Sequence, residues 1–275
     1  MHTTTFSDED YRVQYLGTNP SLRLPIWYMI LFSFLGHSLL FYCLPTSITP
    51  FIKSYIISTV HACVSVLAVS IFYGRGLIDF TQVNKILGGG MAGTPDETMT
   101  YSICYSSGYF IYDLLIMLWF KSVRTPSAIA HHIIILVAGL AGLYTHVAHA
   151  SHFFMLAEEL STIPLNLKTI YHKRTRLHDL FAHLFIVAFF FSRLIYGTII
   201  CSYTFRAVPI FIQMASTVHD TSSIAFVIAQ VFLFIFTRLL NLYWTILIIR
   251  KLFVAFRSKR SPVLTNDMKL KKKAL

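Results

Sequence analysis

The sequence has 275 residues, of which 55% are hydrophobic and only 13% are charged. A soluble globular domain carries about 25% charged residues, and the mean hydropathy of this chain is +0.62. These values exclude a soluble domain and a disordered chain, and they indicate a membrane protein. The net charge of +11 would suggest a nucleic-acid partner in a soluble protein, but here the cations concentrate after Ile249. This placement favours a tail at the membrane surface and no nucleic-acid partner.

Seven apolar runs are long enough to cross a bilayer core of about 30 Å, which needs about 20 helical residues. In chain order they cover residues 24–44, 51–73, 102–120, 129–147, 149–170, 178–204 and 222–250. The sequence therefore predicts an all-α fold, a multi-pass transmembrane helical bundle of seven spans.

The distribution of lysine and arginine predicts the orientation of these spans. Most cations fall in residues 121–124, 168–176 and 250–275, and seven spans place all three segments on one side. Cytosolic segments carry the excess of positive charge, so we expect a lumenal N-terminus and a cytosolic C-terminus. Lys272 and Lys273 resemble the cytosolic dilysine signal for retrieval to the endoplasmic reticulum. Binding of these lysines to anionic lipid is the alternative.

The expected organisation follows from the spans and their orientation. Residues 1–23 form a lumenal N-terminal segment, and residues 24–49 form the first transmembrane helix and its connection. Residues 50–258 form a six-helix domain, and residues 259–275 form a cytosolic basic tail.

Polar residues recur at helical spacing within the spans. In the second span the intervals are four, three and four residues: Ser54, Ser58, His61 and Ser65. The third span shows the same intervals: Ser102, Ser106, Tyr109 and Asp113. Such spacing places each set on one face of its helix.

The later spans also carry ionisable or strongly polar residues. The fourth span opens with His131 and His132. The fifth carries His152, Glu159 and Asn166 at seven-residue intervals, with Glu158 beside them, the sixth carries Arg193, and the seventh carries Arg238 and Asn241. Ionisable groups at membrane depth are costly and usually face a bundle interior. We therefore expect six spans around a central polar cavity, with the first span at the edge.

Several of these segments together resemble the TLC-domain family, over roughly residues 50 to 258. The resemblance rests on Ser58–Ala62, Gly108–Leu114, the His131-His132 pair and Glu158–Asn166. It is stronger for small TLC-domain-containing proteins than for the ceramide synthases, which share the fold. The resemblance implies a lipid-handling membrane protein of the endoplasmic reticulum, with membrane lipids as its partners.

Two functions remain open at this point. One is a protein of lipid homeostasis that binds or organises long-chain lipids through His61, Tyr109, Glu158, Asn166, Arg193, Arg238 and Asn241. The other is a ceramide-synthase-like acyltransferase that moves a fatty acyl group from acyl-coenzyme A to a lipid amine. In ceramide synthases the paired histidines are catalytic, which implies that role for His131 and His132, with Asp113 or Glu159 orienting an imidazole. Glu158 and Glu159 stand where ceramide synthases have a histidine-aspartate step and a further acidic residue.

No bound cofactor and no metal is expected. A di-iron centre is disfavoured because His146, His149 and His152 are separated from His131 and His132 by about 20 Å of helix rise. A proton-linked transporter would explain buried acidic residues, but the chain has no internal repeat. A homodimer is left open.

Overall fold

The computed structural model describes residues 24–75, 97–145 and 147–273, and every regular element in these ranges is helical. Residues 1–23, the glycine-rich residues 88–90 and the side chains of Lys272 and Lys273 lie outside what is described. The elements in chain order are α2 (Ile26–Cys43), α3 (Pro50–Gly74), α4 (Glu97–Trp119), α5 (Pro126–Thr145), α6 (His149–Met155), η5 (Leu156–Ser161), α7 (Thr162–Ile170), α8 (Thr175–Phe189), η6 (Phe190–Tyr196), α9 (Gly197–Thr217) and α10 (Thr221–Lys273).

Two of the helical segments change pitch along their length. The α6–α7 segment, residues 149–170, contains the 3₁₀ helix η5 in its middle. The α8–α9 segment, residues 175–217, contains the π-helix η6. With each counted as one continuous segment, the described part of the chain has seven helices, in agreement with the predicted number.

Among the described residues, five helices are long and apolar enough to cross a membrane: Ile26–Cys43, Pro50–Gly74, Pro126–Thr145, Thr175–Thr217 and Thr221–Val254. The two other predicted spans, α4 and the α6–α7 segment, do not meet that standard. About half of the residues of α4 are buried against other helices. A helix sheltered by protein can carry polar side chains that a lipid-exposed helix cannot. The 3₁₀ helix η5 divides the α6–α7 segment into two short α-helices.

The turn between α2 and α3 is closed by side-chain caps at both helix ends. The hydroxyl of Thr49 accepts a hydrogen bond from the backbone nitrogen of Ile52 at 3.4 Å, and Pro50 occupies the first helical position. Both features are typical of a helix start. The ammonium group of Lys53 donates to the carbonyl oxygens of Phe41 (3.2 Å) and Leu44 (2.6 Å). A buried cation thus satisfies the C-terminal carbonyls of α2.

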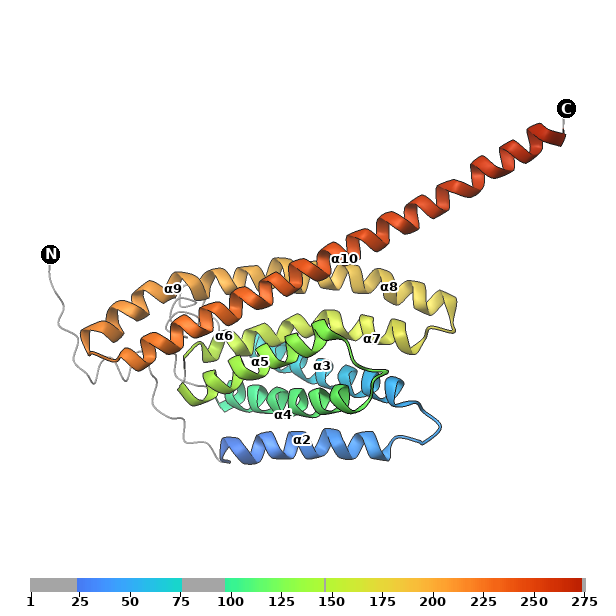
Figure 1. Ribbon diagram of the computed structural model, residues 1–275. Coiled ribbons are helices and arrows are strands. Elements are labelled where there is room, and N and C mark those ends of the chain that lie inside the picture. The colour runs from blue at the N-terminus through green and yellow to red at the C-terminus, as the bar shows by residue number, and fades with distance from the viewer. Residues whose placement is uncertain (1–23, 76–96, 146, 274–275) are drawn as a thin grey trace. The chain divides into compact units, whose positions relative to one another are not determined.

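Helix α2 packs mainly on α4, and the two lie side by side in Figure 1. Their backbones approach closely at Gly108, where an added Cβ would lie 2.5 Å from the carbonyl oxygen of Ile30 and 2.6 Å from the Cβ of Ser33. Such close contact needs a glycine. The hydroxyl of Ser33 donates to the carbonyl of Tyr105 across this contact at 2.5 Å.

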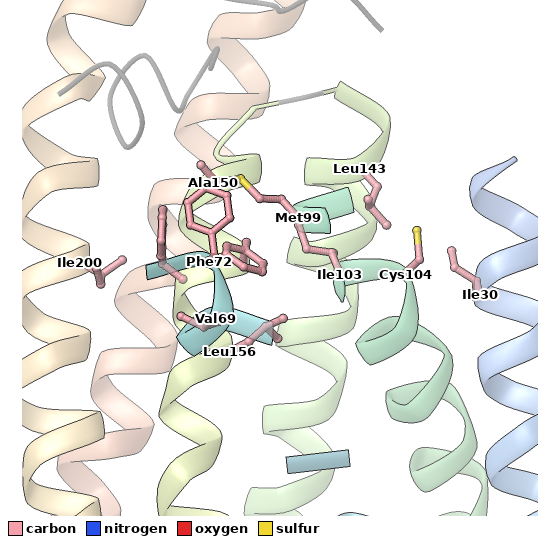
Figure 2. Close-up of a cluster of buried hydrophobic side chains, with 12 residues drawn as sticks. Ile30, Val69, Phe72, Met99, Ile103, Cys104, Leu143, Ala150, Leu156 and Ile200 are labelled. Carbon is pink, nitrogen blue, oxygen red and sulfur yellow. The ribbon is translucent and has the colours of Figure 1, made fainter. Parts of the chain in front are cut away.

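A large apolar cluster fills the bundle at the end where α3 finishes and α4 begins (Figure 2). It includes Val69 and Phe72 of α3, Ile103 of α4, Leu143 of α5 and Ile200 of α9. Aromatic rings of α3 and α6 meet in it, with Phe72 and Phe153 centroids 5.3 Å apart. This end of the bundle is therefore a packed apolar core, and the polar groups described below concentrate elsewhere.

The chain forms two compact units, residues 1–237 and residues 238–275. The boundary falls inside α10. Arg238 and Asn241 belong to the second unit, so the site described below is built from the first unit alone.

Candidate functional site

The polar faces predicted for α3 and α4 meet along the length of both helices. At one end Ser54 donates to Oδ1 of Asp113 at 3.1 Å. Further along, the ring of His61 of α3 lies against the ring of Tyr109 of α4. We call this contact the α3–α4 polar seam. Its hydrogen bonds replace those that water would make outside a membrane.

The far end of the seam is built around His61, which is fully buried. Its Nε2 lies 3.1 Å from the hydroxyl of Ser106 and 3.2 Å from that of Ser65. The imidazole stacks on Tyr109, with ring centroids 3.8 Å apart and an interplanar angle of 10°. Its Nδ1 has no hydrogen-bond partner among the described residues. His61 therefore lies inside the protein and joins α3 to α4 at this end of the seam.

Asp113 is the centre of the first polar group of the candidate site. Its side chain is buried, and Oδ2 lies 3.4 Å from Nδ1 of His132. Ser54, Asp113 and His132 come from α3, α4 and α5, three different helices. The arrangement sets one ring nitrogen of His132 against a carboxylate, which is the usual way a protein fixes the tautomer of a histidine.

His131 and His132 are not equivalent in the structure. Neighbouring residues of an α-helix point about 100° apart, and it is His132 that pairs with Asp113 at 3.4 Å. The two imidazole centroids are 5.7 Å apart, and the ring of His132 also packs edge-on against Phe110 at 5.1 Å. His131 is buried as well. The sequence presents the two as one pair, whereas the fold gives them different surroundings.

The second polar group is the ion pair of Arg193 and Glu159. Nη2 of Arg193 lies 3.5 Å from Oε1 of Glu159, and both side chains are at most 10% exposed. Nε of Arg193 donates to the hydroxyl of Ser161 at 2.9 Å, and Nη2 is 3.4 Å from that of Thr162. The guanidinium is thus held by a carboxylate and two hydroxyls.

Irregular helices supply both members of this ion pair. Glu159 lies on η5 and Arg193 on η6. Short π-helices are frequent at functional sites because they turn side chains out of register with the rest of the helix. Glu158 is buried too, and its carbonyl accepts from Ser192 of η6 at 3.4 Å. The irregular helices η5 and η6 therefore pack against each other.

The two polar groups together bring four largely buried ionisable side chains into the bundle, those of Asp113, His132, Glu159 and Arg193. We call these four residues the charged cluster. In a weakly polarisable interior charges interact much more strongly than in water.

Other predicted site residues have distinct positions. Asn166 of α7 is 2% exposed, and its Nδ2 has no hydrogen-bond partner among the described residues. His152 does not join Glu159: its Nε2 lies 3.1 Å from Oε1 of Gln230 in α10. Glu159 and His152 contact different helices because His152 lies on α6 and Glu159 lies on the 3₁₀ helix η5 that follows it. Within the residues described, no group of three or more His, Cys, Asp or Glu side chains is arranged to hold a metal ion.

The sequence interpretation missed several contributors. Ser161 and Thr162 hold Arg193, and His37 of α2 contacts the hydroxyl of Tyr105 at 3.2 Å. The four-residue interval between Ser33 and His37 could have predicted that His37 belongs to a polar face of α2. In the structure Ser33 Oγ and His37 Nδ1 lie 3.3 Å apart. No sequence signal marks the partners of Arg193, because they depend on the pitch of η5.

An all-helical bundle with several apolar membrane-spanning helices and buried charged groups defines a multi-pass membrane protein. The TLC-domain family model matches residues 51–250, and the chain belongs to this family. Comparisons with curated proteins and with solved structures give no match.

Proposed function

We propose that this TLC-domain protein binds the polar part of a long-chain lipid at the charged cluster, and that it serves lipid homeostasis in the endoplasmic reticulum membrane. The observation that carries the proposal is the presence inside the bundle of two pairs of ionisable side chains, His132–Asp113 and Arg193–Glu159, all of them at most 12% exposed. Helix packing in membranes needs only weak polar contacts. A concentration of ionisable groups in a membrane interior is costly, and it favours a functional role.

The chemistry of the cluster indicates what kind of lipid it would hold. Arg193 offers a forked donor suited to a carboxylate or phosphate, and Asp113 and Glu159 offer acceptors for an amine or hydroxyl. Asn166 adds a buried amide donor with no partner among the described residues. A central cavity bounded by six helices, with His61, Tyr109 and Glu158 in its walls, would accommodate the lipid.

The location and orientation of the protein form part of the proposal. The N-terminus would be lumenal and the C-terminus cytosolic, which places the start of α5, with His131 and His132, near the cytosolic surface. Lys272 and Lys273 would act as a retrieval signal on the cytosolic side.

The His132–Asp113 geometry favours a second candidate, an acyl-coenzyme A-dependent N-acyltransferase. With Nδ1 facing the carboxylate, Nε2 of His132 is left to take a proton from a lipid amine. The amine nitrogen would then attack the thioester carbon, forming the C–N bond and breaking the C–S bond. The imidazolium would return its proton to the departing thiolate. Arg193 would stabilise the developing oxyanion.

Mass spectrometry of the purified protein tests both functions. Lipids that co-purify from membranes are quantified for the wild type, for His132→Ala and for the matched variant His131→Ala. We expect His132→Ala to lose most of a specific lipid and His131→Ala to lose less, because only His132 faces Asp113. Equal lipid content in all three proteins would contradict the binding site.

The same three proteins in liposomes, supplied with mixed acyl-coenzyme A and lipid amines, test the acyltransferase. A new amide lipid made by wild type and lost in His132→Ala would establish catalysis. A specific bound lipid without any new product would leave lipid binding as the function. Amide formation that persists in His132→Ala would exclude that residue as the base.

A further inference from the structure

A cleft at the other end of the α3–α4 polar seam is separate from the charged cluster. It has a volume of about 330 Å³, and its walls include Ser65 and Ala68 of α3 and Tyr101, Ser102 and Tyr105 of α4. Ser65 lies 11 residues beyond Ser54, which corresponds to about 16 Å of helix rise. The cleft is therefore too far from Asp113 to be part of the same pocket.

The cleft opens toward the lipid-facing side of the bundle. Val64 belongs to its wall and is 42% exposed. The exposed residues Val60, Leu67 and Ile71 lie on the same side of α3, at helical intervals from Val64. A continuous exposed apolar face on a membrane-spanning helix faces hydrocarbon. A molecule could therefore enter the cleft sideways from the bilayer.

The walls combine a mostly apolar surface with a few hydroxyls, and none of the described residues that line them is charged. The hydroxyl of Ser65 belongs to the His61 network, at 3.2 Å from Nε2. The hydroxyl of Tyr105 lies 3.2 Å from Nε2 of His37. Each hydroxyl oxygen has capacity for a further hydrogen bond. The cleft can thus bind one small neutral polar group.

These properties select one class of membrane lipid. Phospholipids and fatty acids carry charged groups that would be buried here without an ionic partner. The volume is at the lower end of the range for ligand pockets, which favours a compact rigid molecule over two flexible chains. The rings of Tyr101 and Tyr105 provide flat surfaces against which another rigid ring system can pack. We propose that this cleft is a binding site for a membrane sterol, with the sterol hydroxyl bonded to the hydroxyls of Ser65 and Tyr105.

Photolabelling of the full-length protein tests the proposal. The protein is reconstituted in phosphatidylcholine nanodiscs with a sterol that carries a diazirine and an alkyne, and labelled peptides are identified by mass spectrometry. We expect saturable labelling of the α3 and α4 peptides around Ser65 and Tyr105. Excess cholesterol should compete, and added phosphatidylcholine should not.

Variants that fill the cleft give the decisive comparison. Ala68→Phe places a ring in the cleft and should weaken competition by cholesterol about tenfold. Leu67→Phe is the matched control, because Leu67 is the neighbouring residue and its side chain is 58% exposed. We expect cholesterol to compete for labelling of this variant as it does for the wild type. Ser102→Leu adds a smaller side chain to the cleft from the opposite wall. It tests sterol binding if Ala68→Phe does not fold.

Three results would overturn the proposal. They are undiminished labelling in the folded cleft variants, absence of saturable labelling at the two peptides, and preferential labelling by a photoreactive diacylglycerol or fatty acid. His132→Ala should keep its sterol labelling because the cleft does not depend on the charged cluster. Loss of sterol binding with the co-purifying lipid retained would therefore reject only this inference.

Discussion

The α3–α4 polar seam and the pair of irregular segments show two different ways of burying polar groups. In the seam, two regular helices place serine, tyrosine and histidine side chains opposite one another at ordinary helical intervals. In the α6–α7 and α8–α9 segments, changes of pitch bring Glu159 to Arg193. The seam is made mainly of neutral hydrogen bonds, whereas the irregular segments hold a full ion pair. Regular geometry suffices for the first, and the second depends on local departures from it.

The largest loss of stability should come from removing one charged side chain of the α6–α7 and α8–α9 segments. Arg193→Leu leaves Glu159 buried without its cation, which we expect to cost about 3–5 kcal/mol in unfolding free energy. Denaturation in mixed micelles measures it. Arg206→Leu on the exposed side of α9 is the matched control and should cost little. The double variant Arg193→Leu/Glu159→Leu should recover most of the loss, and failure to recover would show that the ion pair is not the cause.

A smaller loss of stability is expected from a substitution at the contact between the regular helices α2 and α4. Gly108→Ala would bring a methyl group to 2.5 Å from the carbonyl of Ile30, and the backbones would have to separate. We expect a cost of about 1–3 kcal/mol, measured by the same denaturation. Gly36→Ala in α2 is the control, since nothing lies within 4 Å of its added Cβ. Equal stability of the two variants would argue against close packing of α2 on α4.

The smallest effect should come from a neutral link between a regular and an irregular region. Oε1 of Gln230 accepts a hydrogen bond from Nε2 of His152 at 3.1 Å, and Nε2 of Gln230 donates to the carbonyl of Ala138 at 3.0 Å. Gln230→Leu should cost about 1 kcal/mol, as interhelical hydrogen bonds in membranes typically do. Phe232→Leu, at an exposed position of α10, provides the reference in the same assay. A loss as large as that of Arg193→Leu would show that the contrast between neutral and charged contacts is wrong.

Prediction from sequence succeeded where helices are regular. The intervals of four, three and four residues in α3 and α4 identify the side chains that meet in the seam, because 3.6 residues per turn places them on one face. The seven helical segments also follow from the apolar runs. Of the seven predicted spans, five are long and apolar enough to cross a membrane among the described residues, and α4 does not meet that standard because its burial among other helices lets it carry serines and Asp113.

Prediction was weaker where pitch changes. The seven-residue interval between His152 and Glu159 suggested one shared face, but the helix changes from α to 3₁₀ at Leu156, and the two residues contact Gln230 and Arg193 respectively. The neighbouring positions of His131 and His132 suggested joint action, while only one of them contacts Asp113. In both cases sequence spacing could not reveal which helix would pack against which face.

The sequence by itself determined that this is a helical membrane protein with the TLC domain, because length, hydropathy and local motifs are properties of short stretches of chain. It also predicted polar faces on several helices and a set of candidate site residues. Only the tertiary structure decided that His132 and not its neighbour meets Asp113, and that Glu159 meets Arg193. Those contacts join helices far apart in the chain, and their geometry depends on packing and on the pitch of η5 and η6, which the spacing of residues along the chain does not encode.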